Sequence, residues 1–356
     1  LTPSSAPTQT ATDAPQATPA PTQATGAPAG TRSNPLPIGV TGLFDGTDEI
    51  VNTFKVELTL TEVIRGDEAL QMAKAANQFN DDPPEGKEYL FAKFKVKGLA
   101  STDDAVIDVN NAKFDLVSSS GTVYDDFVSV AGLTPSLGDL YAGGEKEGYA
   151  YFYVDENDAA PTIVFLDYIH EGLWFTTDPD AKLAEGSQVY TPEAGADTPT
   201  QAPSGRQGTR TNPIPAGTTG TYDGTEEVVN AFRVDMTVTE VIRGDSALQM
   251  AKAANRFNED PPEGMEYLFV KFKVKALEGE GDDAIDINNA QFDLISSGGV
   301  KYDDFVSVAG LEPKFTEMYP GAEIEGFAYF YVAVEDESPT VVFLDYINDG
   351  LWFAIQ

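Results

Sequence analysis

The side chains that could do chemistry in this chain are almost all carboxylates. The sequence has no cysteine and one histidine, His170, and the position 178 residues further on is Asn348. Hydrolytic triads need a histidine or cysteine partner, and transition-metal sites need imidazole or thiolate ligands. Such a role at His170 would be absent from the second copy, so the sequence disfavours both classes, and we interpret His170 as a surface turn residue.

Acidic and amide side chains gather in several turns of the sequence. Calcium takes six to eight oxygen ligands, typically from carboxylates and amides on one loop. The spacing here matches no known calcium loop, so two interpretations stand, a calcium site or solvated acidic turns. The candidate calcium ligands are Asp103, Asp104, Asp108, Asn110, Asp125, Asp126, Asp282, Asp283, Asp286, Asn288, Asp303 and Asp304.

Aromatic residues form a second candidate site. They recur at every other position in one predicted strand of each half, so their rings share one face of that strand. Such a row could stack on sugars or anchor a protein partner. The alternative is that this face packs beneath a helix that carries Met72 and Phe79. The candidate partner-binding residues are Tyr149, Tyr151, Tyr153, Phe327, Tyr329 and Tyr331.

The tripeptide Arg-Gly-Asp occurs twice, at residues 65–67 and 243–245. Integrins recognise this tripeptide, but here glycine turns the chain out of a strand and aspartate is placed to cap the following helix. A capping carboxylate accepts hydrogen bonds from backbone N–H groups, so it cannot also reach a partner's metal. We therefore assign the tripeptide a structural role.

The elements that would position these residues belong to an internal repeat. Residues 31–175 align with 209–353 at a constant offset of 178 without a gap, and about two thirds of the paired positions are identical. Each unit of about 145 residues is long enough to be one complete domain. Trp174 and Trp352 close the two units, and we expect both in the core.

Within each unit the dominant hydrophobic period is two, which is typical of half-buried strands. Residues 54–60 and 90–96 alternate in this way, and further strands are predicted near 106–118, 122–130, 147–154, 162–167 and 172–176. One helix is predicted from Asp67 to about Phe79, and again from Asp245 to about Phe257. The predicted fold class is all-β, with two tandem immunoglobulin-like β-sandwich domains that each carry one inserted α-helix.

Composition sets the domain boundaries and excludes some partners. We predict a disordered Pro/Thr/Ala-rich stalk at 1–30, repeat 1 at 31–176, a flexible linker at 177–208 and repeat 2 at 209–356. The formal net charge of −36 disfavours nucleic acid and anionic membrane surfaces. No stretch approaches the ~18–20 consecutive apolar residues of a membrane span.

Several turn and core motifs are similar to those of a known family. They are Thr31-Arg32-x-Asn34-Pro35, Pro84-Glu85-Gly86-Lys87-Glu88-Tyr89, Phe114-x-Leu116 with Gly121 and Tyr124, and Gly148-x-x-x-Phe152-x-Val154. Over both repeats the chain resembles Gram-positive surface lipoprotein domains grouped as domain of unknown function 4352. The resemblance implies a sandwich akin to a secreted mycobacterial antigen, export, and lipid attachment through a cysteine before Leu1. It implies no catalytic residues.

Together these features predict a non-catalytic, extracellular binding or adhesion module on the envelope of a Gram-positive bacterium, acting through its duplicated domains. Its partner would be a protein or an envelope glycan. The first alternative is a calcium-dependent binding or structural module, with calcium as its only cofactor. The second is a glycosidase that uses two carboxylates at a fixed separation.

Overall fold

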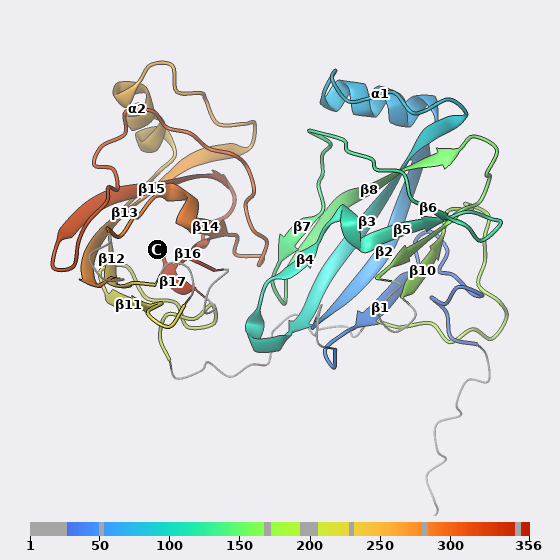
Figure 1. Ribbon diagram of the computed structural model, residues 1–356, viewed down its shortest axis with the longest axis horizontal. Coiled ribbons are helices and arrows are strands. Elements are labelled where there is room, and N and C mark those ends of the chain that lie inside the picture. Colours follow the sequence, from blue (N-terminus) through green and yellow to red (C-terminus); the bar gives the residue numbers. More distant parts are fainter. Residues whose placement is uncertain are drawn as a thin grey trace, which may run out of the picture.

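The computed structural model describes residues 27–49, 53–166, 172–192, 206–227, 231–279, 284–345 and 350–356. Within these ranges the chain folds as two β-sandwich repeats with the same order of main elements (Figure 1). The predicted fold class, all-β with one helix inserted in each repeat, is confirmed. His170 and Asn348 lie outside the described residues.

Repeat 1 encloses its core between two antiparallel sheets, with strand orders β1-β2-β3-β8 and β10-β9-β5-β6. A short β4-β7 ribbon lies on the side of repeat 1 that faces repeat 2 (Figure 1). The strands are β1 (Thr41–Asp45), β2 (Phe54–Arg65), β3 (Lys87–Ser101), β4 (Ile107–Val109), β5 (Phe114–Val117), β6 (Val123–Tyr124), β7 (Gly138–Leu140), β8 (Glu145–Asp155), β9 (Thr162–Phe165) and β10 (Leu173–Thr176).

Repeat 2 has the same two layers, with strand orders β11-β12-β13-β15 and β14-β16-β17. Its strands are β11 (Thr219–Asp223), β12 (Arg233–Arg243), β13 (Met265–Glu278), β14 (Phe292–Ile295), β15 (Glu323–Ala333), β16 (Thr340–Phe343) and β17 (Leu351–Ala354). The two tryptophans close the repeats as expected, since Trp174 is 8% and Trp352 is 2% exposed.

The core follows from the alternation of apolar residues along the strands. In β2, Phe54, Val56, Leu58 and Leu60 are at most 4% exposed, as a period of two predicts. Strand β3 departs from this rule, because residues 89–92 are all fully buried. Their alternate side chains point into two cores, one between the sheets and one beneath the helix.

The inserted helix α1 (Asp67–Ala76) lies over the outer face of the first sheet (Figure 1). It packs through Ala69 and Ala73, which are both 0% exposed, onto Tyr89 and Phe91. Helix α2 (Asp245–Ala254) does the same in repeat 2. No helix among the described residues is long and apolar enough to span a membrane.

Both ends of the helix differ from the prediction. Gly66 occupies the N-cap with a φ of 67°, and no side chain caps the helix, so the predicted Asp67 cap is wrong. Asp67 is instead the first helical residue, where a negative charge favours the helix dipole. The helix ends at Ala76 because Asn77 takes extended backbone angles. Phe79 therefore lies beyond the helix and is 82% exposed, whereas the helical period placed it underneath.

The predicted strand at 122–130 is also shorter than expected. Only Val123 and Tyr124 pair, with Val117 and Leu116 of β5. Residues 125–130 have no regular secondary structure. Asp125 and Asp126 open this segment, and aspartate is among the poorest strand formers.

Part of the predicted linker lies on repeat 1. Gln188 exchanges backbone hydrogen bonds with Ala27 and Ala29. The Tyr190 hydroxyl donates to the Glu57 carboxylate over 2.6 Å. Residues 177–190 thus continue repeat 1 beyond its predicted boundary. The predicted stalk at 1–30 is likewise too long, because Gly30 accepts from the Trp174 N–H and donates to the Asn34 carbonyl. Residues 1–26 of this stalk and residues 193–205 of the predicted linker lie outside the described residues.

Candidate interaction surfaces

The repeat 1 residues predicted as calcium ligands make separate contacts within the protein. Asp104 forms a bidentate ion pair with Arg210 of repeat 2, at 2.7 Å and 2.5 Å. Asp108 accepts two hydrogen bonds from the Asn110 amide, at 2.9 Å and 2.8 Å. The Asn110 carbonyl in turn caps the 3-10 helix Asn111–Lys113. Asp103 is exposed and has a φ of 55°.

The other predicted ligands are similarly dispersed. Asp126 pairs with Lys87, and Asp303 lies 3.4 Å from Lys146. Asn288 donates to Asp286 over 2.8 Å and caps the 3-10 helix Asn289–Gln291. Across the described ranges, no three His, Cys, Asp or Glu side chains are grouped to hold a metal ion. Calcium binding stays a prediction. Of its remaining candidates, Asp125 and Asp304 are exposed, and Asp282 and Asp283 lie outside the described residues.

The predicted aromatic rows lie beneath the two helices. Tyr149 and Tyr153 are 9% and 8% exposed and belong to the cluster that includes Ala69 and Ala73 of α1. In repeat 2, Phe327 and Tyr331 are 3% and 7% exposed beneath α2. This is the packing alternative set out above, and it leaves little of these four rings for a partner. Tyr151 and Tyr329 are half-buried at the edge of the same clusters.

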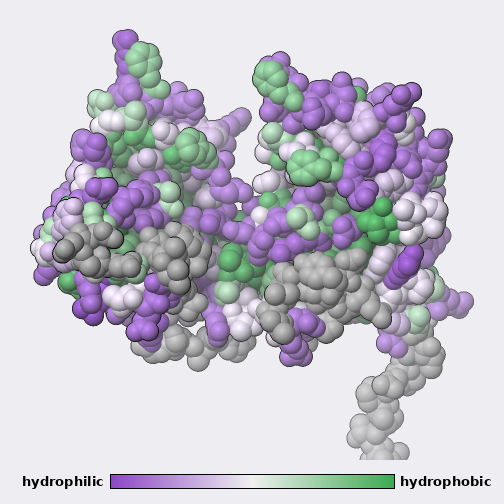
Figure 2. All heavy atoms as spheres, in the orientation of Figure 1, coloured by the Kyte–Doolittle hydropathy of each residue, from purple (hydrophilic) through white to green (hydrophobic). Residues whose placement is uncertain are grey.

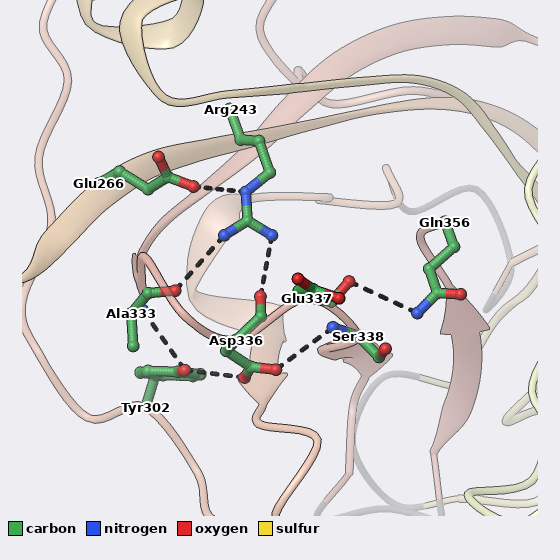
Figure 3. A network of polar contacts seen from close by, with 8 residues as sticks. All are labelled: Arg243, Glu266, Tyr302, Ala333, Asp336, Glu337, Ser338 and Gln356. Atoms are coloured by element: carbon green, nitrogen blue, oxygen red, sulfur yellow. Dashed lines mark hydrogen bonds and ion pairs between the residues drawn. The ribbon is translucent and has the colours of Figure 1, made fainter.

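The arginines of the two Arg-Gly-Asp tripeptides are bound within the fold. Arg243 donates from Nε to Glu266 over 2.5 Å, and from Nη1 to the Asp336 carbonyl over 2.9 Å (Figure 3). The Asp336 carboxylate accepts from the Tyr302 hydroxyl over 2.8 Å and from the Ser338 N–H over 3.3 Å. These contacts, rather than helix capping, support a structural role for the tripeptide.

The same network recurs in repeat 1. Arg65 contacts Glu88 and the Asp158 carbonyl, and the Tyr124 hydroxyl donates to the Asp158 carboxylate over 2.9 Å. Burial raises the pKa of Tyr124 to about 12, and the hydrogen bond to Asp158 adds to this. Burial also acts to raise the pKa of Asp158, but hydrogen bonds from Tyr124 and Ser119 outweigh it and hold this pKa below its usual value.

Four exposed phenylalanines form a feature that the sequence analysis missed. Phe79 and Phe127 of repeat 1 are 82% and 90% exposed, and their counterparts Phe257 and Phe305 are 75% and 90% exposed. We call each pair the phenylalanine surface of its repeat. Figure 2 shows hydrophobic groups standing out from a largely hydrophilic surface at the helix-bearing end of both repeats. The retention of both rings in both copies was the signal that the sequence contained.

A buried asparagine connects the two segments that carry each pair. Asn80 follows Phe79 and is 6% exposed. Its amide donates to the Ala73 carbonyl over 2.8 Å and to the Ala131 carbonyl over 3.0 Å, and its own carbonyl accepts from the Ala131 N–H over 2.8 Å. Asn258 makes the same three bonds in repeat 2. The helix end is thus joined to the loop that holds the second phenylalanine.

A groove of about 620 Å³ lies beside Phe305 in repeat 2. It brings together residues that the sequence analysis had assigned to two different candidate sites. The aromatic side chains among its lining include Tyr302, Phe305 and Tyr329, and the polar ones include Asn288, Asp303 and Asp304. Aromatic rings beside carboxylates suit a sugar, with an apolar ring face and hydroxyl donors, or a basic peptide.

The two repeats contact each other through a compact junction. The Tyr141 ring of repeat 1 packs edge-on against Trp352 of repeat 2, with centroids 5.2 Å apart. The Tyr141 N–H donates to the Gly299 carbonyl over 2.7 Å, and Leu140 forms an antiparallel bridge with Val300. The Arg210 guanidinium lies 5.3 Å from the Tyr141 ring centroid. These contacts bury Tyr141 to 2% exposure.

Two carboxylates and one lysine lie at the edge of this junction. Lys301 Nζ is 3.0 Å from Asp293 and 3.7 Å from Asp345, and Asp345 also accepts from the Tyr141 hydroxyl over 3.3 Å. Burial and the neighbouring Asp345 charge raise the pKa of Asp293 to about 6, although Lys301 acts in the opposite direction. The raised pKa therefore has a structural cause in a shared ion-pair network.

Three solved structures are similar to parts of this chain, all at low sequence identity. No family model matches the chain, so the resemblance to domain of unknown function 4352 is not supported by a family match. No curated protein matches it. The secreted protein MPT63 from Mycobacterium tuberculosis is 16% identical with a TM-score of 0.29, covering 40% of this chain and 97% of its own.

Two Bacillus subtilis structures are similar at the same level. A candidate lipoprotein, ycdA, is 15% identical with a TM-score of 0.25, covering 35% of this chain and 36% of its own. The yjhA protein is 14% identical with a TM-score of 0.24, covering 40% of this chain and 96% of its own. This chain thus spans about a third of the length of ycdA. Likenesses at these scores carry no conclusion about function.

Proposed function

We propose that this chain is a non-catalytic, extracellular binding module that holds a protein or glycan of the cell envelope through its two phenylalanine surfaces. The observation that supports this most directly is that both repeats expose two phenylalanine rings to water, which is unfavourable for the free protein. Phe79, Phe127, Phe257 and Phe305 are each at least 75% exposed, although both repeats bury their other phenylalanines almost completely or in part.

Exposed aromatic rings have a physical cost that binding would recover. Fully burying a phenylalanine side chain is worth about 1.5–3 kcal/mol relative to leaving it in water. Aromatic side chains are also enriched among the residues that dominate binding free energy. Because the buried Asn80 and Asn258 fix the segments that carry the rings, less conformational entropy is lost when a partner covers them.

The groove beside Phe305 adds polar contacts to this surface in repeat 2. Asp303 and Asp304 can accept hydrogen bonds from sugar hydroxyls or pair with lysine and arginine of a protein. Tyr302 and Phe305 offer ring faces for stacking. A formal charge of −36 favours neutral or basic partners over acidic ones.

The glycosidase alternative is less well supported by the carboxylate geometry. Retaining enzymes hold their two carboxyl groups ~5–5.5 Å apart, and inverting enzymes hold them further apart, so that the sugar fits between them. Asp293 and Asp345 lie 3.0 Å and 3.7 Å from the same Lys301 Nζ, so this lysine occupies the space between them that a sugar would need. We therefore assign this pair to the junction between the repeats.

An extracellular location on a Gram-positive envelope, with a lipid anchor before Leu1, is part of the same proposal. The absence of cysteine is compatible with an exported fold that does without disulfides. The Pro/Thr/Ala-rich composition of residues 1–30 suits a spacer between an anchor and the first repeat.

Cosedimentation of the full chain with Gram-positive cells tests the proposal. We would compare intact cells, protease-treated cells and purified sacculi, each with calcium and with chelator. The variant carries Phe79→Ala, Phe127→Ala, Phe257→Ala and Phe305→Ala. The control carries Val189→Ala and Val334→Ala, which remove apolar surface at positions that are 39% and 56% exposed.

We expect the wild type and the control to bind equally, and the four-alanine variant to bind at least about tenfold more weakly. Loss of binding after protease treatment would identify a protein partner, and retention on sacculi would identify a glycan. Loss of binding in chelator would support the calcium-dependent alternative. Equal binding by the four-alanine variant would contradict the proposal.

A further inference from the structure

The junction between the repeats joins two different surfaces. Repeat 1 contributes the end of β7, here called the Tyr141 edge (residues 138–141). Repeat 2 contributes the Trp352 face, which consists of Gly299, Val300, Lys301 and Trp352. Such a contact is heterologous, because neither surface meets its own copy. In Figure 1, β4 and β7 accordingly face β14 and β16 across the space between the repeats.

Because the chain is a tandem repeat, each surface exists a second time. The counterpart of the Tyr141 edge is the Tyr319 edge of repeat 2 (residues 316–319). The counterpart of the Trp352 face is the Trp174 face of repeat 1, consisting of Gly121, Thr122, Val123 and Trp174. Within one chain the first two surfaces cover each other, and the second two are left over.

The exposure of matched residues shows this difference. Tyr141 is 2% exposed, whereas Tyr319 is 59% exposed. Gly299, Val300 and Lys301 are half-buried, whereas Gly121, Thr122 and Val123 are all exposed, Val123 at 48%. Tyr319 and Val123 are thus exposed at the positions whose counterparts, Tyr141 and Lys301, lie in the junction.

We propose that the Tyr319 edge of one chain docks on the Trp174 face of a second copy, and repeats the junction that exists within each chain. The occupant of both surfaces is this chain itself. A heterologous contact joins successive copies head-to-tail, and it gives a ring where the rotation between copies closes and an open filament where it does not.

The chemistry of the left-over surfaces fits this contact at several points. Across the described residues, neither the Tyr319 N–H nor the Gly121 carbonyl has a hydrogen-bond partner, and their counterparts bond to each other in the junction. Among the residues that the structure describes, Met318 bridges only to Ile285, so the other side of this strand has no described strand partner. Tyr319 would place its ring against Trp174, as Tyr141 does against Trp352.

Arg32 supplies a further matched element. Its guanidinium lies 5.8 Å from the Trp174 ring centroid, on its own repeat. The counterpart Arg210 lies instead over Tyr141 of the neighbouring repeat. Arg32 therefore covers a ring that a second copy would contact, and it could stack on Tyr319 once that ring arrives.

The charged contacts predict that assembly between chains is weaker than the junction within a chain. Within the chain, Lys301 lies 4.0 Å from Asp139. At the matching positions of the proposed contact stand Val123 and Glu317, which cannot form an ion pair. Lys146 lies 3.4 Å from Asp303. The matching residues are Ile324 and Asp125, so this ion pair is also lost between chains. Two chains with a formal charge of −36 also repel each other, and salt screens this repulsion.

Sedimentation velocity of the full chain tests the proposal. We expect the weight-average mass to rise between about 10 µM and about 500 µM protein, and more steeply in about 0.5 M NaCl than in dilute buffer. Tyr319→Ala should remain monomeric over this range. The control is Phe257→Ala, which removes an exposed ring of the phenylalanine surface and should associate as the wild type does.

Charge substitutions make the test specific to this geometry. Val123→Lys would restore the lysine that the junction has at position 301, opposite Glu317, and should tighten association about three- to tenfold. Val123→Glu should weaken it, and Glu317→Lys in the same chain should restore it. The proposal would be overturned if Tyr319→Ala associated as the wild type does, or if Val123→Lys left the mass unchanged at every concentration.

Discussion

Asn80 shows how one buried side chain can hold the two segments that carry Phe79 and Phe127. It bonds the Ala73 carbonyl at the end of α1 and both backbone groups of Ala131. Removing its amide would leave the N–H and the carbonyl of Ala131 without this partner, whereas the Ala73 carbonyl would still accept from the Asn77 N–H. Each unsatisfied group costs about 1–3 kcal/mol. We expect Asn80→Ala to destabilise repeat 1 by about 2–4 kcal/mol in calorimetry. Gln78→Ala, at an exposed neighbour, is the control, and equal melting of the two variants would refute this role.

Asp293 gives a pH-dependent prediction. Its pKa is raised to about 6 by burial and by Asp345, so the folded state binds more protons than the unfolded state between about pH 4 and pH 6. The stability that protonated Asp293 contributes to the fold is fully present below pH 3.8, the pKa of this carboxyl in the unfolded chain. It is lost as the pH rises through this window. Asp293→Asn keeps a neutral side chain at every pH.

We therefore expect Asp293→Asn to stabilise repeat 2 by about 1–3 kcal/mol at pH 7.5, and to have little effect near pH 4. Thermal unfolding at both pH values measures this, with the exposed Asp304→Asn as control. A change in melting temperature of the same size at both pH values would show that titration of Asp293 is not the cause.

For single residues, the sequence predicted burial correctly at some positions and wrongly at others. It placed Trp174 and Trp352 in the core, and both are buried, but outside the core between the two sheets. Trp174 packs with Val117 and Val164, and Trp352 packs against Tyr141 at the junction. It did not identify Phe79 as exposed, because the helical period continues to this residue while the helix stops at Asn77. The segment after the helix is held by Asn80, which bonds to Ala131 about 50 residues away, and no local pattern records this contact.

At the scale of elements, α1 is held by the close approach of small residues to the sheet. Ala69 and Ala73 are 0% exposed against Tyr89 and Phe91. Ala73→Leu would force the helix away from the sheet, and overpacking of this kind costs about 1–3 kcal/mol. We expect a corresponding loss of thermal stability. Ala75→Leu, at an exposed position of the same helix, should be nearly neutral, and equal effects of the two would contradict this packing.

The strands were predicted well wherever one face meets water. Residues 54–60 alternate in sequence and in burial, because only one side of β2 contacts the core at these positions. Residues 89–92 do not alternate in burial, since α1 adds a second core on the other face. The strand predicted near 106–118 is two short strands, β4 and β5, separated by a 3-10 helix. Strand β7 was missed, because three residues carry too few positions to show a period.

At the scale of the whole molecule, duplication was evident in the sequence but the junction was not. The two copies share about two thirds of their residues, yet they contact each other through unlike surfaces. Tyr141 and Tyr319 are identical in type and differ in exposure by more than half of their surface. That difference arises because Tyr141 lies against Trp352 of the other repeat, whereas no second repeat covers Tyr319.

The proposed function requires the two phenylalanine surfaces of one chain to bind a multivalent envelope target together. Two linked sites gain avidity, typically about 10²–10⁴-fold over one site. The most direct measurement is a set of binding isotherms on Gram-positive cells, at protein concentrations below those of self-association. It compares the full wild-type chain with Phe79→Ala/Phe127→Ala, with Phe257→Ala/Phe305→Ala, and with all four substitutions.

We predict that either double variant loses at least about tenfold in apparent affinity, because one surface then binds without the other. The variant with all four substitutions should lose the remaining binding. A double variant that bound as tightly as the wild type would contradict the cooperation of the two repeats. Wild-type binding by the variant with all four substitutions would contradict the binding surface itself.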